Sequence, residues 1–123
     1  MSTAAAPATP TLGEWRAKAG RLLKIQRAVP WALGDHLLVG EQAFGERIAA
    51  ALDELGLEIG EAVELARVGS RFPPERRRRG LSFAHHTAVA DLEPVDADRL
   101  LDAAEAAGWT VRRLEREVRG TRR

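Results

Sequence analysis

The chain has 123 residues, a formal net charge of +1, 45% hydrophobic residues, 5% aromatic residues and no cysteine. This length fits one domain with a modest core, and the lack of cysteine excludes disulfides and thiolate metal sites, as is common in cytoplasmic proteins. No apolar run is long enough to cross a membrane, and the small net charge argues against nonspecific nucleic-acid binding.

The first third of the chain predicts a tail followed by two helices. Residues 1–11 are rich in Ser, Thr, Ala and Pro, lack the basic start and apolar core of a signal peptide, and are expected to be disordered. A helix is predicted from Leu12 to Ala28, ended by Val29-Pro30, because proline cannot continue a helix. Pro30 would open the next helix, with a kink or break at Gly40.

The next two segments have the proportions of a helix-turn-helix. Glu41 to Leu55 is predicted as a helix with an apolar stripe, and Gly56 as the glycine that ends it. Glu58 to Phe72 is predicted as the second helix. The stripe consists of Phe44, Ile48, Leu52 and Leu55, and the expected inward face of the second helix consists of Ile59, Ala62, Val63, Ala66 and Phe72. Any two short helices in a bundle can give the same pattern.

The last third contains clear helix boundaries. Ser82 is a good N-cap for a helix to Leu92, and Pro94 opens another that Gly108 stops. Thr110 caps the last helix, which has a buried stripe at Val111, Leu114 and Val118. With no strand pattern, the sequence predicts an all-α fold. It would be a small multi-helix bundle over residues 12–120 that contains the helix-turn-helix, with a basic tail at residues 121–123.

Four consecutive arginines, Arg76, Arg77, Arg78 and Arg79, follow the sequence Phe72-Pro73-Pro74. The prolines end one helix and Ser82 starts the next, so the arginines are expected in a short exposed connection. Guanidinium groups fixed beside helix ends suit phosphate, because arginine stays charged and presents a rigid fork of donors. The alternative is a solvated basic turn.

Charge is arranged in blocks. Basic residues gather from Arg67 to Arg79, acidic residues from Asp91 to Glu105, and basic residues again from Arg112 to Arg123. Three interpretations remain open. The basic blocks face DNA while the acidic helix faces away, the acidic block of one protomer meets a basic block of another, or the charged faces are simply solvated.

No residue pattern indicates an enzyme. His85 and His86 are adjacent on a helix, so their side chains diverge by about 100° and cannot chelate one metal ion. His86 falls on the apolar face and is predicted to be a hydrogen-bonded core residue, with His85 exposed. There is no phosphate-binding loop, no glycine-flanked serine nucleophile and no dinucleotide fingerprint. We therefore expect no catalytic residue, metal or cofactor.

One joint pattern extends from Trp31 to Arg119. Its parts include Trp31-Ala32-Leu33-Gly34-Asp35-His36-Leu37, Gly40-Glu41, Phe44-Gly45-Glu46, Ala51-Leu52, Val68, Ser70-Arg71-Phe72-Pro73, Arg77-Arg78, Leu81-Ser82-Phe83, His85-His86, Val89-Ala90, Leu92, Gly108-Trp109-Thr110-Val111 and Leu114. This pattern resembles the LmbU family of bacterial transcriptional regulators and their phage and plasmid relatives. A more distant resemblance is to the helix-turn-helix of ParB and KorB partition proteins. It implies that Glu46 to Leu55 is the first helix of a DNA reader and Glu58 to Phe72 the recognition helix in the major groove.

These resemblances imply a cytoplasmic, sequence-specific transcriptional regulator that binds double-stranded DNA. The candidates for base contact are Glu61, Glu64 and Arg67. The candidates for phosphate contact are Arg71 and Arg76 to Arg79, with Arg112, Arg113 and Arg116 as further possibilities.

The acidic recognition helix departs from the resemblance. It carries Glu58, Glu61 and Glu64 where related proteins more often have Ser, Thr, Gln or Asn, and acids near phosphates weaken binding. Either the helix is rotated so that Arg67, Ser70 and Arg71 face DNA, or the scaffold has another use. The alternative function is a protein-interaction adaptor that binds a basic partner through its acidic helices.

A homodimer is also expected, because a single reader makes few base contacts and such modules commonly bind two half-sites as a symmetric pair. The candidate dimer contact is the N-terminal helix with Trp15, Leu22 and Ile25. Alternatively, this helix closes the core of its own protomer.

Overall fold

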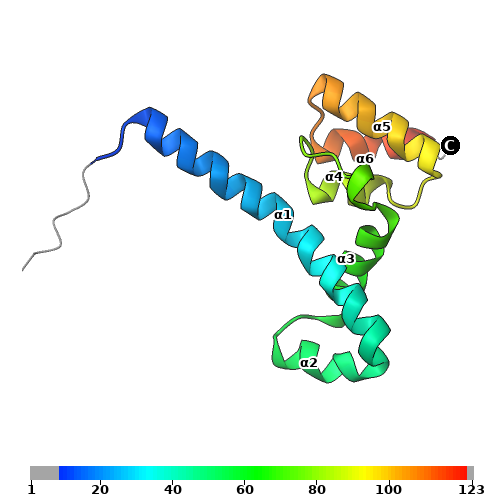
Figure 1. The fold of residues 1–123 in the computed structure, drawn as a ribbon. Helices are drawn as coiled ribbons and strands as arrows, with labels where there is room; N and C mark the ends of the chain where they lie inside the picture. Colours follow the sequence, from blue (N-terminus) through cyan, green and yellow to red (C-terminus); the bar gives the residue numbers. More distant parts are fainter. Residues whose placement is uncertain (1–8, 122–123) are drawn as a thin grey trace, which may run out of the picture.

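A computed structural model describes residues 9–121 of the chain, and over that range the fold is all-α with no strand, as predicted. The elements in order are α1 (Leu12–Phe44), the 3-10 turn η1 (Gly45–Arg47), α2 (Ile48–Glu54), α3 (Ile59–Arg71), the 3-10 turn η2 (Pro74–Arg76), α4 (Phe83–Val89), α5 (Pro94–Ala107) and α6 (Val111–Thr121). Most of the two expected tails lies outside the described residues. Figure 1 shows α4, α5 and α6 bundled at one end of α3, α2 at the other end, and the first half of α1 projecting away from both.

α1 is one continuous helix of 33 residues, so the predicted breaks at Pro30 and Gly40 are wrong. A capping box starts the helix: the Glu14 amide donates to Thr11 Oγ1 at 3.1 Å, and the Thr11 amide donates to the Glu14 carboxylate at 3.0 Å. Strong helix formers before Pro30 and packing after it outweigh the hydrogen bond that proline removes. The helix ends at Gly45, whose φ of 56° is accessible to glycine without strain.

Two apolar clusters form the core. The larger one joins the end of α3 to α4, α5 and α6, where Phe72, Val89, Leu101 and Leu114 are at most 1% exposed. The smaller cluster joins α1, α2 and α3 and consists of Leu37, Leu52, Ala62 and Ala66. Since two of these four side chains are alanine, the smaller cluster contributes less burial free energy than the larger one.

α3 packs on α1 through small side chains, and this changes which residues face inward. Ala62 and Ala66 are buried as predicted, but Ile59 and Val63 are each 60% exposed, so the predicted inward face is only partly right. The single helix predicted from Glu41 to Leu55 is wrong, because α1 continues to Phe44 and the 3-10 turn at Gly45 separates it from α2. Its predicted stripe is only partly right, since Phe44 and Leu55 are 56% and 79% exposed. A helix that approaches its neighbour closely turns its small residues, not its β-branched ones, toward the contact.

The closest approach of α1 to α3 is at Gly34. A Cβ atom added at Gly34 would lie 2.5 Å from the backbone oxygen of Leu65. Gly69 of α3 faces the same contact, because an added Cβ there would lie 3.7 Å from the carbonyl carbon of Gly34. The two backbones therefore touch, with no room for a side chain on α1.

The predicted helix boundaries in the last third are confirmed except for one, because the helix expected to run to Leu92 ends at Val89. The His85 amide donates to Ser82 Oγ at 3.2 Å, α5 begins at Pro94, and Gly108 follows its last residue. Thr110 Oγ1 accepts a 3.1 Å hydrogen bond from the Arg113 amide at the start of α6. These signals are local, so the sequence alone was enough to predict them.

His86 is the buried polar side chain at the junction of α1, α3 and α4, as predicted. Its Nε2 accepts a 3.0 Å hydrogen bond from the Arg78 amide, so Nδ1 carries the proton and donates to the Ser82 carbonyl at 2.8 Å. The imidazole also contacts the rings of Trp31 and Phe72 edge-on. His85 is half-buried and not exposed as predicted, because its Nε2 lies 2.8 Å from the Trp109 carbonyl.

Stability should therefore fall on the acid side of neutrality. Burial lowers the pKa of His86 from its ordinary value of 6.5, so the unfolded chain binds more protons than the folded chain as the pH falls below that value. Urea unfolding between pH 5 and pH 8 should give a free energy that is level above about pH 6.5 and declines below it. His86→Gln, which cannot titrate, should lose that decline. A decline of the same size in His86→Gln would assign it to other groups.

Candidate nucleic-acid interface

The two helices predicted as a reader, α2 and α3, are joined by a tight turn. Gly56 has a φ of 75°, which favours glycine, and the Leu57 amide donates to the Leu52 carbonyl at 2.9 Å. α3 then begins after Glu58, whose backbone is extended. The first turn of α3 is open to solvent, since Glu58, Ile59 and Glu61 are all exposed.

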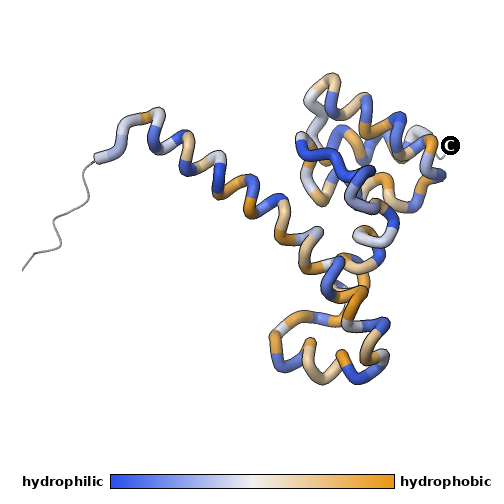
Figure 2. Tube along the Cα trace, in the orientation of Figure 1, coloured by the Kyte–Doolittle hydropathy of each residue, from blue (hydrophilic) through white to orange (hydrophobic). Residues whose placement is uncertain are grey.

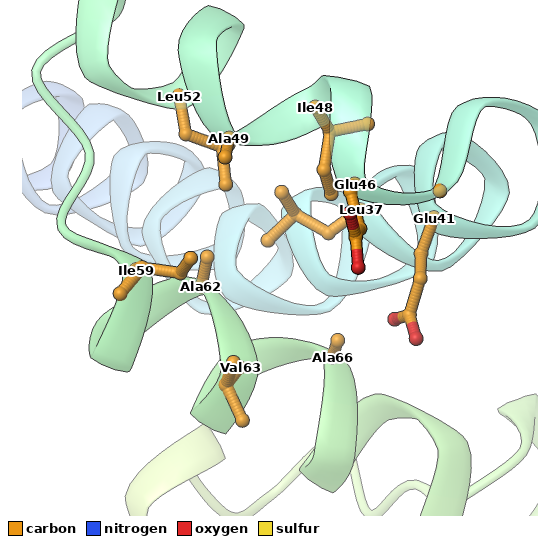
Figure 3. Close-up of a pocket in the computed structure, with 11 residues that line it drawn as sticks. Leu37, Glu41, Glu46, Ile48, Ala49, Leu52, Ile59, Ala62, Val63 and Ala66 are labelled. Atoms are coloured by element: carbon orange, nitrogen blue, oxygen red, sulfur yellow. The ribbon is translucent and has the colours of Figure 1, made fainter.

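An apolar hollow of about 480 Å³ lies between α1, α2 and α3. Figure 3 shows Leu37, Ile59 and Ala62 beside it, with the carboxylates of Glu41 and Glu46 on one side. Val63 also lines this hollow. The exposed β-branched side chains of α3 thus belong to a concave apolar surface with an acidic edge.

Two of the predicted base-contacting residues are engaged with each other. Arg67 Nη2 lies 2.8 Å from the Glu64 carboxylate, and its Nη1 lies 2.6 Å from Asp91. Glu61 is exposed and has no ion pair among residues 9–121. Ser70 is exposed and donates its hydroxyl to the Arg67 carbonyl at 2.8 Å. The structure therefore leaves Glu61 freer for a new contact than Glu64 or Arg67.

The run of four arginines is not the exposed connection that the sequence predicts, because carboxylates of the same chain hold three of its members. Arg76 lies 2.9 Å from Asp98 and donates a second hydrogen bond to the Arg71 carbonyl. Arg78 lies 2.6 Å from Asp102 and 2.7 Å from Glu105. Arg79 is exposed, as is Arg71, and neither has an ion pair within the described range.

Arg77 makes the largest set of contacts in the run, and its side chain is only 15% exposed. Its guanidinium forms a bidentate pair with Asp35 of α1 at 2.8 and 2.9 Å and donates to the Phe72 carbonyl at 2.6 Å. It also donates to the Gly69 carbonyl and lies 4.5 Å from the ring centroid of Trp31. The hydrogen bond from Arg77 lowers the pKa of Asp35, so the pair is ionised at neutral pH. Arg77 therefore fastens α1 to the end of α3.

The acidic block has a role that sequence reasoning missed. Asp98, Asp102 and Glu105 recur on one face of α5, and the basic block of the same chain pairs with them. This internal contact was not among the three interpretations of the charge blocks, and where α5 lies relative to DNA or to another protomer stays a prediction. The spacing of four and three residues was a usable signal, because it places three carboxylates on one side of a helix.

The second basic block lies on α6. Arg112 and Arg116 are exposed and have no ion pair among the described residues. Arg113 pairs with Glu117 at 3.0 Å and lies 4.9 Å from the ring centroid of Trp109. The three possible phosphate contacts on this helix are therefore not equivalent.

The first half of α1 does not close the core of its own protomer, so that alternative is wrong. Trp15, Leu22 and Ile25 are 61%, 55% and 59% exposed. Figure 2 shows alternating hydrophobic and hydrophilic positions along this projecting arm. An exposed apolar series of this length indicates an interaction surface.

Two further findings concern the described residues 9–121. No helix there is both long enough and apolar enough to span a membrane. No group of three or more His, Asp or Glu side chains is arranged to hold a metal ion there.

Comparison with known proteins gives one informative similarity. The chain is 32% identical over 111 residues to the transcriptional regulator NovE of Streptomyces niveus, a match that covers 90% of this chain and 51% of that protein. The chain thus spans about half the length of this relative and is its distant homologue. The relative is a regulator of transcription, consistent with the expectation that this chain is not an enzyme. No family model matches the chain, and no solved structure does.

Proposed function

We propose that this chain is a sequence-specific DNA-binding regulator of transcription in which α2 and α3 act as a helix-turn-helix. The observation that carries the proposal is how α3 is packed and which part of it is exposed. Its small face, with Ala62 and Ala66, is fixed against α1, and its first turn is open to solvent. Helix-turn-helix readers place the N-terminal residues of the second helix against base edges. The similarity to a transcriptional regulator supports the same function.

Within this proposal the candidate residues fall into two groups. Glu61 is the base-contacting residue that needs no rearrangement, while Glu64 and Arg67 act as a pair whose mutual contact reduces the repulsion between Glu64 and phosphate. Arg71 and Arg79 contact phosphates directly, and Ser70 directly precedes Arg71 in α3. Arg76, Arg77 and Arg78 contribute mainly by shaping the loop, with remaining N–H groups available to phosphate.

One observation favours the alternative function, a protein-interaction adaptor. The apolar hollow beside Ile59 and Val63 has carboxylates of Glu41 and Glu46 at its edge, which suits a basic amphipathic helix. The acidic face of α5 supports this alternative less strongly, since arginines of the same chain already pair with Asp98 and Asp102.

Glu61→Gln distinguishes the two functions. A glutamate accepts a hydrogen bond from cytosine, whereas a glutamine pairs with adenine, so the variant should bind DNA more tightly overall and change its preference at one base pair. Discrimination between bases at that position should move by about 1–3 kcal/mol, measured by competition between duplexes. An adaptor would instead bind its basic partner more weakly after this substitution. An unchanged base preference in a folded variant would remove Glu61 from the reader.

We assign the proposed homodimer contact to the exposed side of α1. The exposed side of α1 follows alternating steps of three and four residues for three heptads, the spacing of a coiled-coil seam. The seam consists of Leu12, Trp15, Ala19, Leu22, Gln26, Val29 and Leu33. Leu23 and Ile25 flank it, and both are more than half exposed. A second copy of α1 is the partner whose side chains match this spacing.

Gln26 indicates how two copies align. It is the polar residue in an otherwise apolar seam, and such a residue favours the register in which it meets its own counterpart. A parallel pair brings the two Gln26 amides together. Two helices paired along the seam would bury on the order of 1,000 Å² in total, near the lower limit for a stable interface. A parallel pair also presents two readers side by side, as two half-sites require.

Leu22→Glu should weaken this dimer about 100-fold, because it replaces a seam leucine in both copies with a charge, at about 3 kcal/mol. Ala17→Glu is the matched control, since it adds the same charge on the opposite side of the same exposed helix. Sedimentation equilibrium of both variants and the wild type measures the association. A wild type that stays monomeric at protein concentrations on the order of 100 μM, or equal association of the two variants, would contradict the proposed seam.

A further inference from the structure

A basic groove lies where α1 passes the arginine run. Its volume is about 510 Å³. One wall comes from α1 and the other from the loop before α4, although the two segments lie far apart in the sequence. The lining residues are Lys24, Arg27, Ala28, Trp31, Arg77, Arg78, Arg79 and Leu81.

The basic side chains of this groove differ in whether carboxylates of the same chain already pair with them. Arg77 and Arg78 are already neutralised by Asp35 and by the carboxylates of α5. Lys24, Arg27 and Arg79 are exposed, and the structure gives none of them an ion pair within residues 9–121. The groove therefore has three uncompensated positive charges at its rim.

We propose that this groove binds the phosphodiester backbone of DNA, as a second contact beyond the recognition helix. The inference rests on the proposed DNA-binding function and assigns a role to Lys24 and Arg27. Arginine matches phosphate with two donors, and lysine supplies a point charge. The apolar floor at Trp31 and Leu81 suits the sugars between phosphates, which a site for a small free anion would not need.

The groove is preorganised for such a ligand. The ion pairs of Arg76, Arg77 and Arg78 fix the loop before DNA binds, so Arg79 is presented without the entropy cost of ordering that segment. On the opposite wall Lys24 and Arg27 lie one turn apart, about 4.5 Å along the helix axis.

The test is the salt dependence of DNA binding by the full chain. The triple variant Lys24→Ala, Arg27→Ala, Arg79→Ala is compared with a control triple variant that removes the same charge at scattered positions: Arg47→Ala, Arg99→Ala and Arg119→Ala. Affinity for a specific and a random duplex is measured from about 50 to about 300 mM NaCl. Circular dichroism and thermal melting check that both variants fold, as expected because none of the three groove side chains makes a hydrogen bond among the described residues.

The proposal predicts that the groove variant loses affinity for both duplexes. The slope of log K against log salt should become less steep by about 0.9 for each phosphate that the variant no longer neutralises, up to about 2.7. The control variant should keep most of the wild-type slope. If both variants change equally, or if the groove variant binds as the wild type does, the groove makes no backbone contact while the regulator proposal stands. A wild type that binds no duplex overturns both.

Discussion

Gly34→Ala should destabilise the folded chain by about 3 kcal/mol, at the upper end of the range for overpacking. The new Cβ would lie 2.5 Å from the Leu65 backbone oxygen and 3.1 Å from its carbonyl carbon. A backbone atom of a packed helix cannot rotate aside as the end of a side chain can, so α1 and α3 must separate. Separation would also loosen the smaller core cluster and with it the packing that holds α3 in place.

Gly20→Ala is the matched control for this substitution. It lies in the same helix, and a Cβ there would meet no atom of another segment within 4 Å. Alanine is the better helix former, so this variant should gain about 0.5–1 kcal/mol. Urea unfolding of the two variants measures the difference. A Gly34→Ala protein as stable as the wild type would show that the close contact between α1 and α3 is not present in solution.

Arg77→Ala should cost about 2–4 kcal/mol, an unusually large effect for an arginine in a basic run. The substitution removes the bidentate pair with Asp35, two hydrogen bonds to backbone carbonyls and the contact with Trp31. It also leaves the Phe72 carbonyl without the Arg77 donor, which adds a desolvation cost. Arg77→Lys should recover less than half of the loss, because an ammonium group cannot reproduce the planar fork.

Arg79→Ala, two residues away, is the control for charge. Arg79 is exposed and has no ion pair in the described part of the chain, so its loss should change stability by less than about 0.5 kcal/mol. Chemical denaturation and thermal melting give both values. Equal effects of the two substitutions would mean that Arg77 acts only through net charge.

These contrasts show what the arginine run contributes to the proposed function. Three of its guanidinium groups join the loop to α1 and α5, which fixes the end of α3 relative to the rest of the body. Their positive charge is largely neutralised inside the chain. Around the arginine run, the uncompensated positive charge that the proposal assigns to DNA therefore comes from Arg71 and Arg79, together with Lys24 and Arg27 on α1.

The sequence was a good guide wherever structure depends on neighbouring residues. Ser82, Pro94, Gly108 and Thr110 mark helix ends through hydrogen bonds or backbone geometry within a few positions, and all four are confirmed. The break expected at Pro30 is wrong, because the local cost of proline is outweighed by the helix formers before it and by the packing of the residues after it.

Long-range contacts were harder to predict. The inward face of α3 is set by the approach of α1 at Gly34, which favours Ala62 and Ala66 over Ile59 and Val63. Periodicity cannot rank these side chains, since all four fit one helical side. For the candidate site, the exposure of Arg76 to Arg78 was overestimated because their partners lie on distant segments of the chain. The contacts of Glu61, Ser70 and Arg71 with DNA stay predictions.

Sequence-specific DNA binding is tested most directly by selecting bound fragments from a random duplex library with the wild-type chain at near-physiological salt. We expect recovery of one sequence motif, with two half-sites in symmetric arrangement if the α1 seam pairs two readers. Weak binding with no enriched motif, abolished as the salt concentration rises, would contradict the proposed function and leave the acidic α3 and its apolar hollow as a surface for a basic protein partner.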